Sequence, residues 1–318
     1  MIDRQVFPYF GGKGRVATEV WRRLGRVDGY LEPFAGSLAM ALRNPHSEAL
    51  KSETVNDLDP YVANFWRAVS QAPDVVASWA DAPVSQIELT VRHEWLDQQR
   101  DRLRLLLLDT PDAFDPKVAG WWVWGISIWI GSGYLASNKK PGPHLGQRPH
   151  LGHHGMGVHS LGQRPHLGHH GMGGVYDLYR QIAQRLRFTR VVSCDWKSLR
   201  STLHTGCSTW GVFLDPPYTA RTGRCPSLYT AAGPDSQHLT LGDEVATWAR
   251  EIGHHHRVAL CGIAGEYEMP GWDVFDWKTT GFSMGNRDRA EVIWFSPACV
   301  RPSQAGLFDA LAAPPVPK

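Results

Sequence analysis

The chain has 318 residues and a formal net charge of +2 at pH 7, with 42% hydrophobic and 20% charged residues. These values are ordinary for a globular protein, and they exclude a disordered tail protein, a collagen-like chain, a multi-span membrane protein and a histone-like coat of nucleic acid. Two counts are unusual, 14 Trp and 15 His.

The charge is unevenly distributed along the chain. Residues 139–200 contain ten Lys or Arg and two acids, a charge of +8, so the remainder carries −6. The same segment holds eight of the 15 His. Such a local excess indicates one surface that faces an anion, with nucleic acid as the leading candidate and a solvated charged face as the alternative.

The five Cys are widely spaced without a C-x-x-C pair, and the N-terminus lacks the apolar stretch of a secretory signal. Both features favour a cytoplasmic protein.

The apolar pattern predicts strands that alternate with helices, which favours an α/β sheet. Residues 29–42 read as a short strand, a glycine turn and the start of a helix. Residues 52–60 read as a strand that ends in acids, and helical spacing follows from Tyr61 to about Leu108. The later predicted elements are a basic amphipathic helix at 175–188, strands at 191–196 and 210–218, a helix at 236–252, and strands at 257–263 and 290–297.

A direct repeat lies between these predicted elements. The segment LGQRPHLGHHGMG occupies residues 145–157 and recurs unchanged at 161–173, a period of 16 residues. Its Gly and Pro content favours an extended, turn-rich loop or hairpin. Residues 301–318 are rich in Pro and Ala, and we expect them to be disordered.

The strongest single motif is Asp215-Pro216-Pro217-Tyr218, which follows an apolar strand. Because two prolines cannot continue a strand ladder, the chain must leave the sheet at its carboxyl end, where open α/β sheets bind ligands. A carboxylate, a carbonyl and an aromatic face would meet there. The alternative is an ordinary turn with a capping Asp.

Four further segments carry candidate functional residues. In the segment 32–37 (EPFAGS), a small residue after a strand lets a helix N-terminus approach a ligand closely. Asp57 follows Gly36 by about 20 residues, a spacing that suits hydrogen bonds to ribose hydroxyls. Near the start, the segment 9–13 (YFGGK) would present Lys13 on a glycine-flexed loop, or is a simple turn. Asp195 lies at the end of another predicted strand.

In their joint order, these motifs resemble the Dam-type DNA adenine methyltransferases, which use S-adenosylmethionine. The resemblance runs from about Val6 to Pro297. It implies a Rossmann-like methyltransferase core at 1–60 and 191–300, with an inserted, mostly helical target-recognition domain at 61–190. The chain departs from the family at Leu38, where another Gly is frequent, and at Tyr9, which is often Trp.

The resemblance also implies site residues. Tyr9 and Lys13 contact the methyl donor in this reading, Phe34 and Gly36 match the loop on its methionine side, Asp57 is the ribose-binding acid and Asp195 lies near the adenine ring of the cofactor. The complete expected cofactor set is Tyr9, Gly11, Gly12, Lys13, Glu32, Phe34, Gly36, Asp57 and Asp195.

The expected role of the Asp215–Tyr218 motif follows from the chemistry of its target, the exocyclic amine of adenine. This amine is a poor nucleophile, because its lone pair is delocalised into the ring. Asp215 and the carbonyl of Pro216 would therefore accept hydrogen bonds from the two amine hydrogens. Pro217 belongs to the same catalytic motif, and Tyr218 would stack on a base rotated out of the duplex. Transfer would then be direct, with much of the rate from orientation. An RNA or protein N-methyltransferase, or a catalytically inactive DNA-binding relative, remains an alternative.

The insert supplies the expected contacts with double-stranded DNA, for which the candidates are Lys139, Lys140, Arg148 and Arg164. The paired His of the repeat could bind metal, but incidental pairs are more common in loops, and no metal is expected. The uncharged segment 118–136 has the length of a membrane span. It would, however, place Gly36 and Asp215 on opposite sides of a bilayer, so we expect a buried or DNA-facing helix and no membrane contact.

The tail suggests one further partner. Residues Gln304–Phe308 resemble the pentapeptides by which bacterial replication proteins dock on the sliding clamp. We further expect a bacterial or phage-encoded protein that is a monomer or weak dimer and that acts in restriction-modification.

Overall fold

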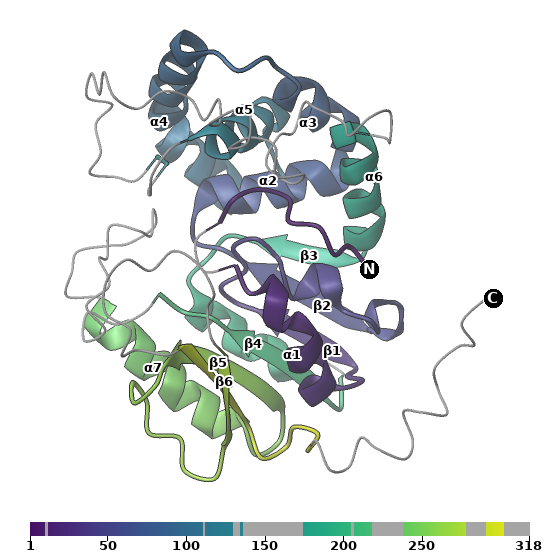
Figure 1. Cartoon of the computed structure of the whole chain (residues 1–318), viewed down its shortest axis with the longest axis vertical. Coiled ribbons are helices and arrows are strands. Elements are labelled where there is room, and N and C mark those ends of the chain that lie inside the picture. Colours follow the sequence, from purple (N-terminus) through teal and green to yellow (C-terminus); the bar gives the residue numbers. More distant parts are fainter. Residues whose placement is uncertain are drawn as a thin grey trace.

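The computed structural model describes residues 1–9, 12–110, 112–129, 134–135, 174–204, 207–217, 238–277 and 291–301. Within these residues a seven-stranded sheet has the order β3-β2-β1-β4-β5-β7-β6 (Figure 1). The strands are β1 (Gly29–Glu32), β2 (Ser52–Asn56), β3 (Thr189–Val192), β4 (Trp210–Leu214), β5 (Arg257–Ile263), β6 (Asp273–Trp277) and β7 (Glu291–Phe295).

The first five strands of this order are parallel, and β7 runs antiparallel to both of its neighbours, β5 and β6. The order 3-2-1-4-5 is that of a Rossmann sheet. The fold class expected from the sequence, a Rossmann-like methyltransferase core, is therefore confirmed.

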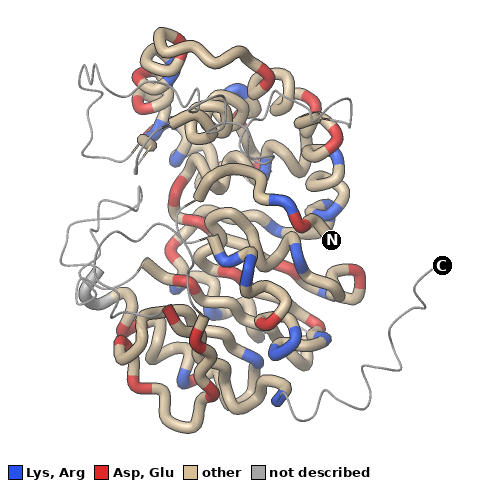
Figure 2. The backbone as a smooth tube through the Cα atoms, viewed as in Figure 1, with Lys and Arg blue, Asp and Glu red and all other residues tan. Residues whose placement is uncertain are grey.

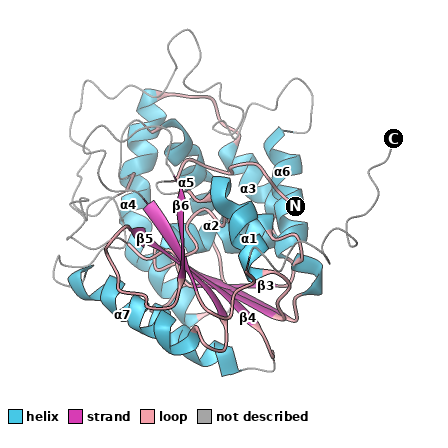
Figure 3. Ribbon diagram, turned by 60° about the horizontal axis from the view of Figure 1, so that its bottom comes forward, coloured by secondary structure: helices cyan, strands magenta, loops and turns pink. Residues whose placement is uncertain are grey.

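Two hydrophobic clusters lie on the two faces of the sheet. Side chains of a strand point alternately to opposite faces, and β4 shows this pattern: Phe213 belongs to one cluster, whereas Val212 and Leu214 belong to the other. The first cluster includes α1 (Ala17–Leu24) and the second includes α7 (His238–Ile252). Figure 3 shows these two helices on opposite sides of the sheet.

A helical layer lies beside the sheet, at the top of Figure 1. It comprises α2 (Pro60–Gln71), α3 (Pro73–Ala80), α4 (Gln86–Asp109), α5 (Pro116–Ile128) and α6 (Gly174–Leu186). Its helix starts are set locally: the Asp115 side chain accepts hydrogen bonds from the backbone N–H groups of Lys117 and Val118, and a proline opens α5. The domain boundaries at residues 60 and 190 stay predictions.

The tryptophan-rich segment forms α5, in which Trp122 and Trp124 are buried. The expected buried helix is thus confirmed over Pro116–Ile128. Among the described residues, no helix combines the length and apolar character that crossing a membrane requires.

The predicted helix after the glycine turn is wrong. Only the 3-10 turns η2 (Ala41–Arg43) and η3 (Ser47–Ala49) lie between β1 and β2. Leu38 has a φ of 52° and is fully buried, and a left-handed residue interrupts a right-handed helix. The sequence reading also missed α1, η1 (Gly14–Val16) and the edge strand β6, and the predicted strand 191–196 is β3 followed by η5 (Trp196–His204).

Candidate functional site

The candidate site lies at the carboxyl edge of the parallel strands. Glu32 ends β1, Asp57 follows β2 and Asp215 follows β4. Because β2, β1 and β4 are parallel neighbours, the three acids lie along the same edge. The meeting of a carboxylate, a carbonyl and an aromatic face that the sequence predicts at this edge stays a prediction, because Tyr218 lies outside the described residues.

The centre of this edge is an ion pair between Lys13 and Asp215. Lys13 Nζ lies 2.9 Å from Asp215 Oδ2, and the lysine side chain is 3% exposed against 20% for the aspartate. The sequence predicts that Lys13 contacts the methyl donor, which stays a prediction, and the structure places its ammonium beside the carboxylate of Asp215. A buried ammonium needs such a partner, because an unpaired buried charge is costly.

Glu291 is a site residue that the sequence analysis did not single out. Its Oε2 lies 4.0 Å from Lys13 Nζ, and its side chain is 5% exposed. The ring of Trp277, its partner on β6, has its centroid 5.9 Å from the same ammonium. The signal available in the sequence was an acid directly before the apolar run 292–295. In the structure all five residues of β7, Glu291 included, are buried.

Glu32 is buried under the loop that follows β1. Its Oε2 accepts hydrogen bonds from the Tyr30 hydroxyl at 2.9 Å and from the Ala41 N–H at 3.3 Å. Burial raises the pKa of Glu32 to about 8, because the charged carboxylate is poorly solvated, although these two hydrogen bonds oppose the shift. Glu32 therefore carries a proton at neutral pH, and the hydrogen bond that it accepts from Ala41 stabilises the loop that follows β1.

The glycine turn has a conformation that requires Gly36. Its φ is +47°, and a Cβ at this position would lie 2.5 Å from Tyr9 Cε1. Gly36 donates its N–H to Asp57 Oδ2 at 2.8 Å and accepts a hydrogen bond from Trp66 Nε1 at 2.8 Å. Tyr9, Asp57 and the helical layer thus fix one residue of the turn. In the N-terminal segment, the Gly12 N–H donates a hydrogen bond to the Tyr9 carbonyl at 3.3 Å.

Asp57 retains the capacity to bind a hydroxyl group. Its two oxygens accept one backbone hydrogen bond each, Oδ2 from Gly36 and Oδ1 from Asp59 at 2.9 Å, and a carboxylate offers about four acceptor positions. Burial raises the pKa of Asp57 to about 7, and the negative charge of Asp59 adds to the shift.

Asn56, beside this acid, has a structural role that the sequence reading did not assign. Its amide donates to the carbonyls of Pro33 and Cys194, at 2.9 and 3.1 Å, and its Oδ1 accepts from the Cys194 N–H at 2.9 Å. Asn56 therefore ties together the ends of β1, β2 and β3, from which the predicted cofactor residues extend.

The remaining described candidates flank this edge. The Phe34 ring centroid lies 6.3 Å from that of Trp196, and the Trp196 ring lies 5.4 Å from that of Trp248 of α7 at an interplanar angle of 44°. Asp195 is exposed, and its Oδ1 accepts the Lys197 N–H at 2.8 Å at the start of η5. Pro216 and Pro217 follow Asp215 beyond β4, outside any regular helix or strand.

Several predicted residues lie outside the described residues. They are Gly11, Tyr218, the DNA-contact candidates Lys139, Lys140, Arg148 and Arg164, both copies of the repeat, and the segment Gln304–Phe308. Where the structure describes the chain, it has no group of three or more His, Cys, Asp or Glu that could hold a metal ion.

The fold and the carboxylates at its edge define the class of protein. A Rossmann-ordered sheet with an antiparallel β7, a glycine turn after β1 and an acid after β2 is a Rossmann-like methyltransferase fold. Residues 9–102 match the family model of the D12 class N6 adenine-specific DNA methyltransferases. This match confirms the resemblance to the Dam-type adenine methyltransferases, and it covers the Lys13 loop, the glycine turn and Asp57. No curated protein matches the chain.

Proposed function

We propose that this chain is a site-specific DNA methyltransferase that transfers a methyl group from S-adenosylmethionine to the 6-amino group of adenine in double-stranded DNA. The observation that carries the proposal is the ion pair between Lys13 and Asp215, which joins the loop before α1 to the catalytic motif after β4. The D12 family match over residues 9–102 supports the same reaction.

The residues of the edge fit the methyl donor. Gly36 lets the Tyr9 ring lie directly on the backbone of the glycine turn, where a Cβ would clash with the ring, and Asp57 has acceptor positions left for ribose hydroxyls. Tyr9, Phe34, Gly36, Asp57 and Asp195 would hold the donor, while Gly11, Gly12, Lys13 and Glu32 would shape and support the loops around it. When bound, the donor supplies an electrophilic methyl group on a sulfonium.

The catalytic motif would prepare the amine. Asp215 and the Pro216 carbonyl would accept hydrogen bonds from its two hydrogens, which favours a pyramidal nitrogen with an available lone pair. The Lys13 ammonium pairs with the carboxylate of Asp215 at 2.9 Å and fixes its position. Tyr218 would stack on the base after the base has rotated out of the duplex.

The same proposal includes the contacts with DNA, the cellular location, the oligomeric state and one further partner. Lys139, Lys140, Arg148 and Arg164 would contact phosphates or guanine edges of the target. The protein would act in the cytoplasm of a bacterium, or be phage-encoded, within restriction-modification, as a monomer or weak dimer. The segment Gln304–Phe308 would dock on a sliding clamp.

A transfer assay with purified protein tests the reaction. Duplex DNA, single-stranded DNA and RNA are each incubated with methyl-labelled S-adenosylmethionine, and the modified nucleoside is identified by mass spectrometry. The proposal requires N6-methyladenine in duplex DNA with the wild type and its loss with Asp215→Asn, which keeps the shape of the side chain but removes its charge. Equal labelling of RNA and duplex DNA, or label in protein alone, would contradict it.

A further inference from the structure

Glu291 is the second carboxylate beside the buried ammonium of Lys13. Its Oε2 lies 4.0 Å from Lys13 Nζ, whereas Asp215 Oδ2 lies 2.9 Å from it. Among the described residues, these are the two acids within 4.0 Å of this ammonium. One cation, from the start of the chain, therefore lies beside two carboxylates from strand ends far along the sequence.

This group is more buried than most ion pairs of the protein. Lys, Arg, Asp and Glu positions are interspersed along the described chain (Figure 2), and most of the described ion pairs have a partner that is at least 40% exposed. Solvent screens the charges of such exposed pairs. In the Lys13 group every side chain is 20% exposed or less, so each charge acts more strongly on its neighbours.

The position of Glu291 is set by the sheet. It is the first residue of β7, and in the strand register it lies opposite Ile263 of β5 and Trp277 of β6. All five residues of β7 are buried. A carboxylate held in this way by a strand between two other strands would be costly without a compensating cation. Lys13 supplies that cation.

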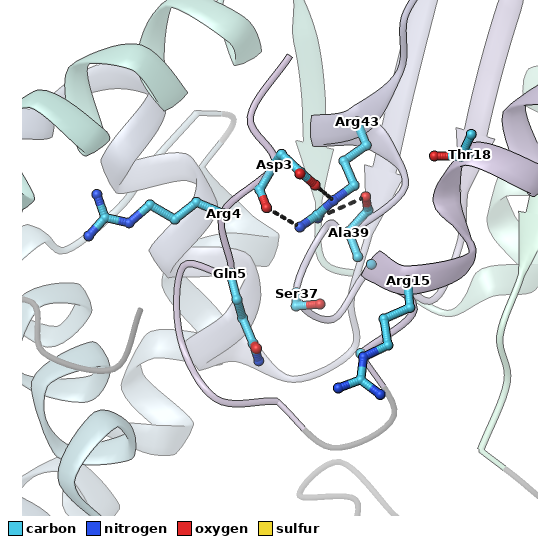
Figure 4. Close-up of a pocket in the computed structure, with 10 residues that line it drawn as sticks. Asp3, Arg4, Gln5, Arg15, Thr18, Ser37, Ala39 and Arg43 are labelled. Atoms are coloured by element: carbon cyan, nitrogen blue, oxygen red, sulfur yellow. Dashed lines mark hydrogen bonds and ion pairs between the residues drawn. The ribbon is translucent and has the colours of Figure 1, made fainter. Parts of the chain in front are cut away.

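Lys13, by contrast, comes from a loop. It directly precedes η1, and its neighbours Gly12 and Gly14 line a cavity of about 470 Å³ (Figure 4). The loop backbone beside Lys13 therefore borders open space on that side. The contacts of the Lys13 side chain with residues of the sheet then determine where its ammonium lies.

Two other titratable groups near these residues carry no charge at neutral pH. Burial raises the pKa of Glu32 to about 8. Burial also raises the pKa of the Cys261 thiol on β5 well above its ordinary value, and the negative charges of Asp215 and Glu291 add to that shift. Lys13, Asp215 and Glu291 together therefore have a formal charge of −1.

This charge bears on the proposed reaction, on which the inference rests. The amine nitrogen would form a bond to the methyl carbon while the sulfur–carbon bond of the donor breaks, so a positive charge passes from sulfur to nitrogen, and one amine proton then leaves to water. Lys13 and Asp215 alone would be a neutral pair, whose carboxylate is a weaker acceptor for the amine hydrogens. A second carboxylate beside Lys13 keeps the group negative, and this favours the charge that develops on the nitrogen.

We propose that Glu291 is a positioning residue that compensates the charge of Lys13, so that the carboxylate of Asp215 remains an effective hydrogen-bond acceptor for the substrate amine. Glu291 acts through Lys13 and does not touch the substrate. Loss of Glu291 alone changes the formal charge of the three groups from −1 to 0, and loss of Lys13 alone changes it to −2. Loss of both returns it to −1, so each replacement should partly correct the other.

Single-turnover kinetics on duplex DNA tests this compensation. Glu291→Gln should lower the rate about 10-fold with little change in donor affinity, and Glu291→Asp, which keeps the charge, should recover part of the loss. Glu291→Gln added to Lys13→Met should raise the rate about 3- to 10-fold above that of Lys13→Met alone. If the two losses are additive, the proposal is overturned.

The matched control is Glu19→Gln. Glu19 lies on α1 and pairs with Arg22 and Arg23 at 2.7 and 2.9 Å, so its replacement also removes an ion-paired glutamate but leaves the Lys13 group intact. Its rate should match that of the wild type. An equal loss of rate in Glu19→Gln and Glu291→Gln would overturn a specific role for Glu291.

Thermal unfolding gives a readout that does not depend on methyl transfer. Glu291→Gln should lower the melting temperature of the wild type but raise that of Lys13→Met, where it removes one of two uncompensated carboxylates. A lower melting temperature in both backgrounds would indicate a merely structural residue and overturn the proposal. If Lys13→Met does not fold, Lys13→Gln takes its place in both comparisons. A wild type that shows the reversal but transfers no methyl group would contradict the proposed function, and the role of Glu291 in it.

Discussion

The buried ammonium of Lys13 is balanced by carboxylates from distant parts of the chain. Asp215 lies 2.9 Å away and Glu291 4.0 Å away, so Lys13 compensates two negative charges at the edge of the sheet. Sequence spacing identified Lys13 and Asp215 as separate motifs. It could not show that they form a pair, because their contact depends on how the N-terminal loop crosses the strand ends.

Replacement of Lys13 by Met should lower kcat by about 100-fold, because Asp215 loses the cation that positions it. The unfolding free energy should fall by about 3 kcal/mol, since two carboxylates are left near each other without a counter-charge. Chemical denaturation and single-turnover kinetics measure the two effects. The double variant with Asp215→Asn should be less destabilised than the sum of the single variants, and simple additivity would contradict the coupling.

Asp57 should make cofactor affinity dependent on pH. Its pKa is raised to about 7, so the carboxylate is largely protonated at pH 6 and ionised at pH 8. Ribose hydroxyls donate better to the ionised form, and affinity for S-adenosylmethionine should therefore rise by about 5- to 10-fold from pH 6 to pH 8. Calorimetry at three pH values measures this. Asp57→Asn should bind weakly with a flat profile; a rise equal to that of the wild type would contradict the assignment.

At the scale of elements, the glycine turn is positioned by three other parts of the chain. Tyr9 comes from the N-terminal segment, Asp57 from the end of β2 and Trp66 from α2. The sequence predicted the turn, because a glycine after an apolar strand is a strong local signal. It did not predict that the following helix would be absent, since Leu38 adopts a left-handed conformation that tertiary packing maintains.

Gly36→Ala tests the close contact in this turn. The new Cβ would be 2.5 Å from Tyr9 Cε1 in addition to the strain of a positive φ, and we expect a loss of about 2–4 kcal/mol in unfolding free energy. Gly265→Ala is the matched control, because Gly265 has a φ of +79° but no atom within 4 Å of the added Cβ. It should lose only about 1 kcal/mol from backbone strain. Equal losses in urea denaturation would contradict a specific role for the Tyr9 contact.

Glu32 should make the stability of the fold decrease as pH rises. Its folded pKa of about 8 exceeds the ordinary value of 4.5, so the folded state binds more protons than the unfolded state between these values. This contribution is fully present below about pH 4.5 and is lost as pH rises through 8. Glu32→Gln keeps an acceptor for Tyr30 and Ala41 without a titrating proton. The unfolding free energy of this variant should depend less on pH between 5 and 8, and a pH dependence identical to that of the wild type would contradict the buried proton.

At the scale of the whole molecule, aromatic side chains join the helical layer to the sheet. Phe7 of the N-terminal segment packs against Phe65 and Trp122, with ring centroids 5.2 and 4.9 Å away. Trp66 bonds to the glycine turn. The helices of the predicted insert therefore share a core with the N-terminal segment.

The excess of tryptophan now has a partial structural explanation. Trp79, Trp95 and Trp121 surround the Lys117 ammonium, with ring centroids at 5.4, 4.6 and 4.3 Å. The sequence predicted a buried or DNA-facing helix here, because a membrane span would separate Gly36 from Asp215. It could not find this cluster, because its members come from three helices and meet only after packing. The order of the strands within the sheet could be predicted only through the family resemblance, whereas their positions along the chain followed from local apolar runs.

Modified-base sequencing of DNA from cells with and without expression of the chain, alongside Asp215→Ala, tests directly whether the protein methylates adenine. We expect N6-methyladenine at one recurrent sequence with the wild type and its absence with the variant. No change in adenine modification on expression of a folded wild-type chain would contradict the assignment of this protein as an adenine-specific DNA methyltransferase.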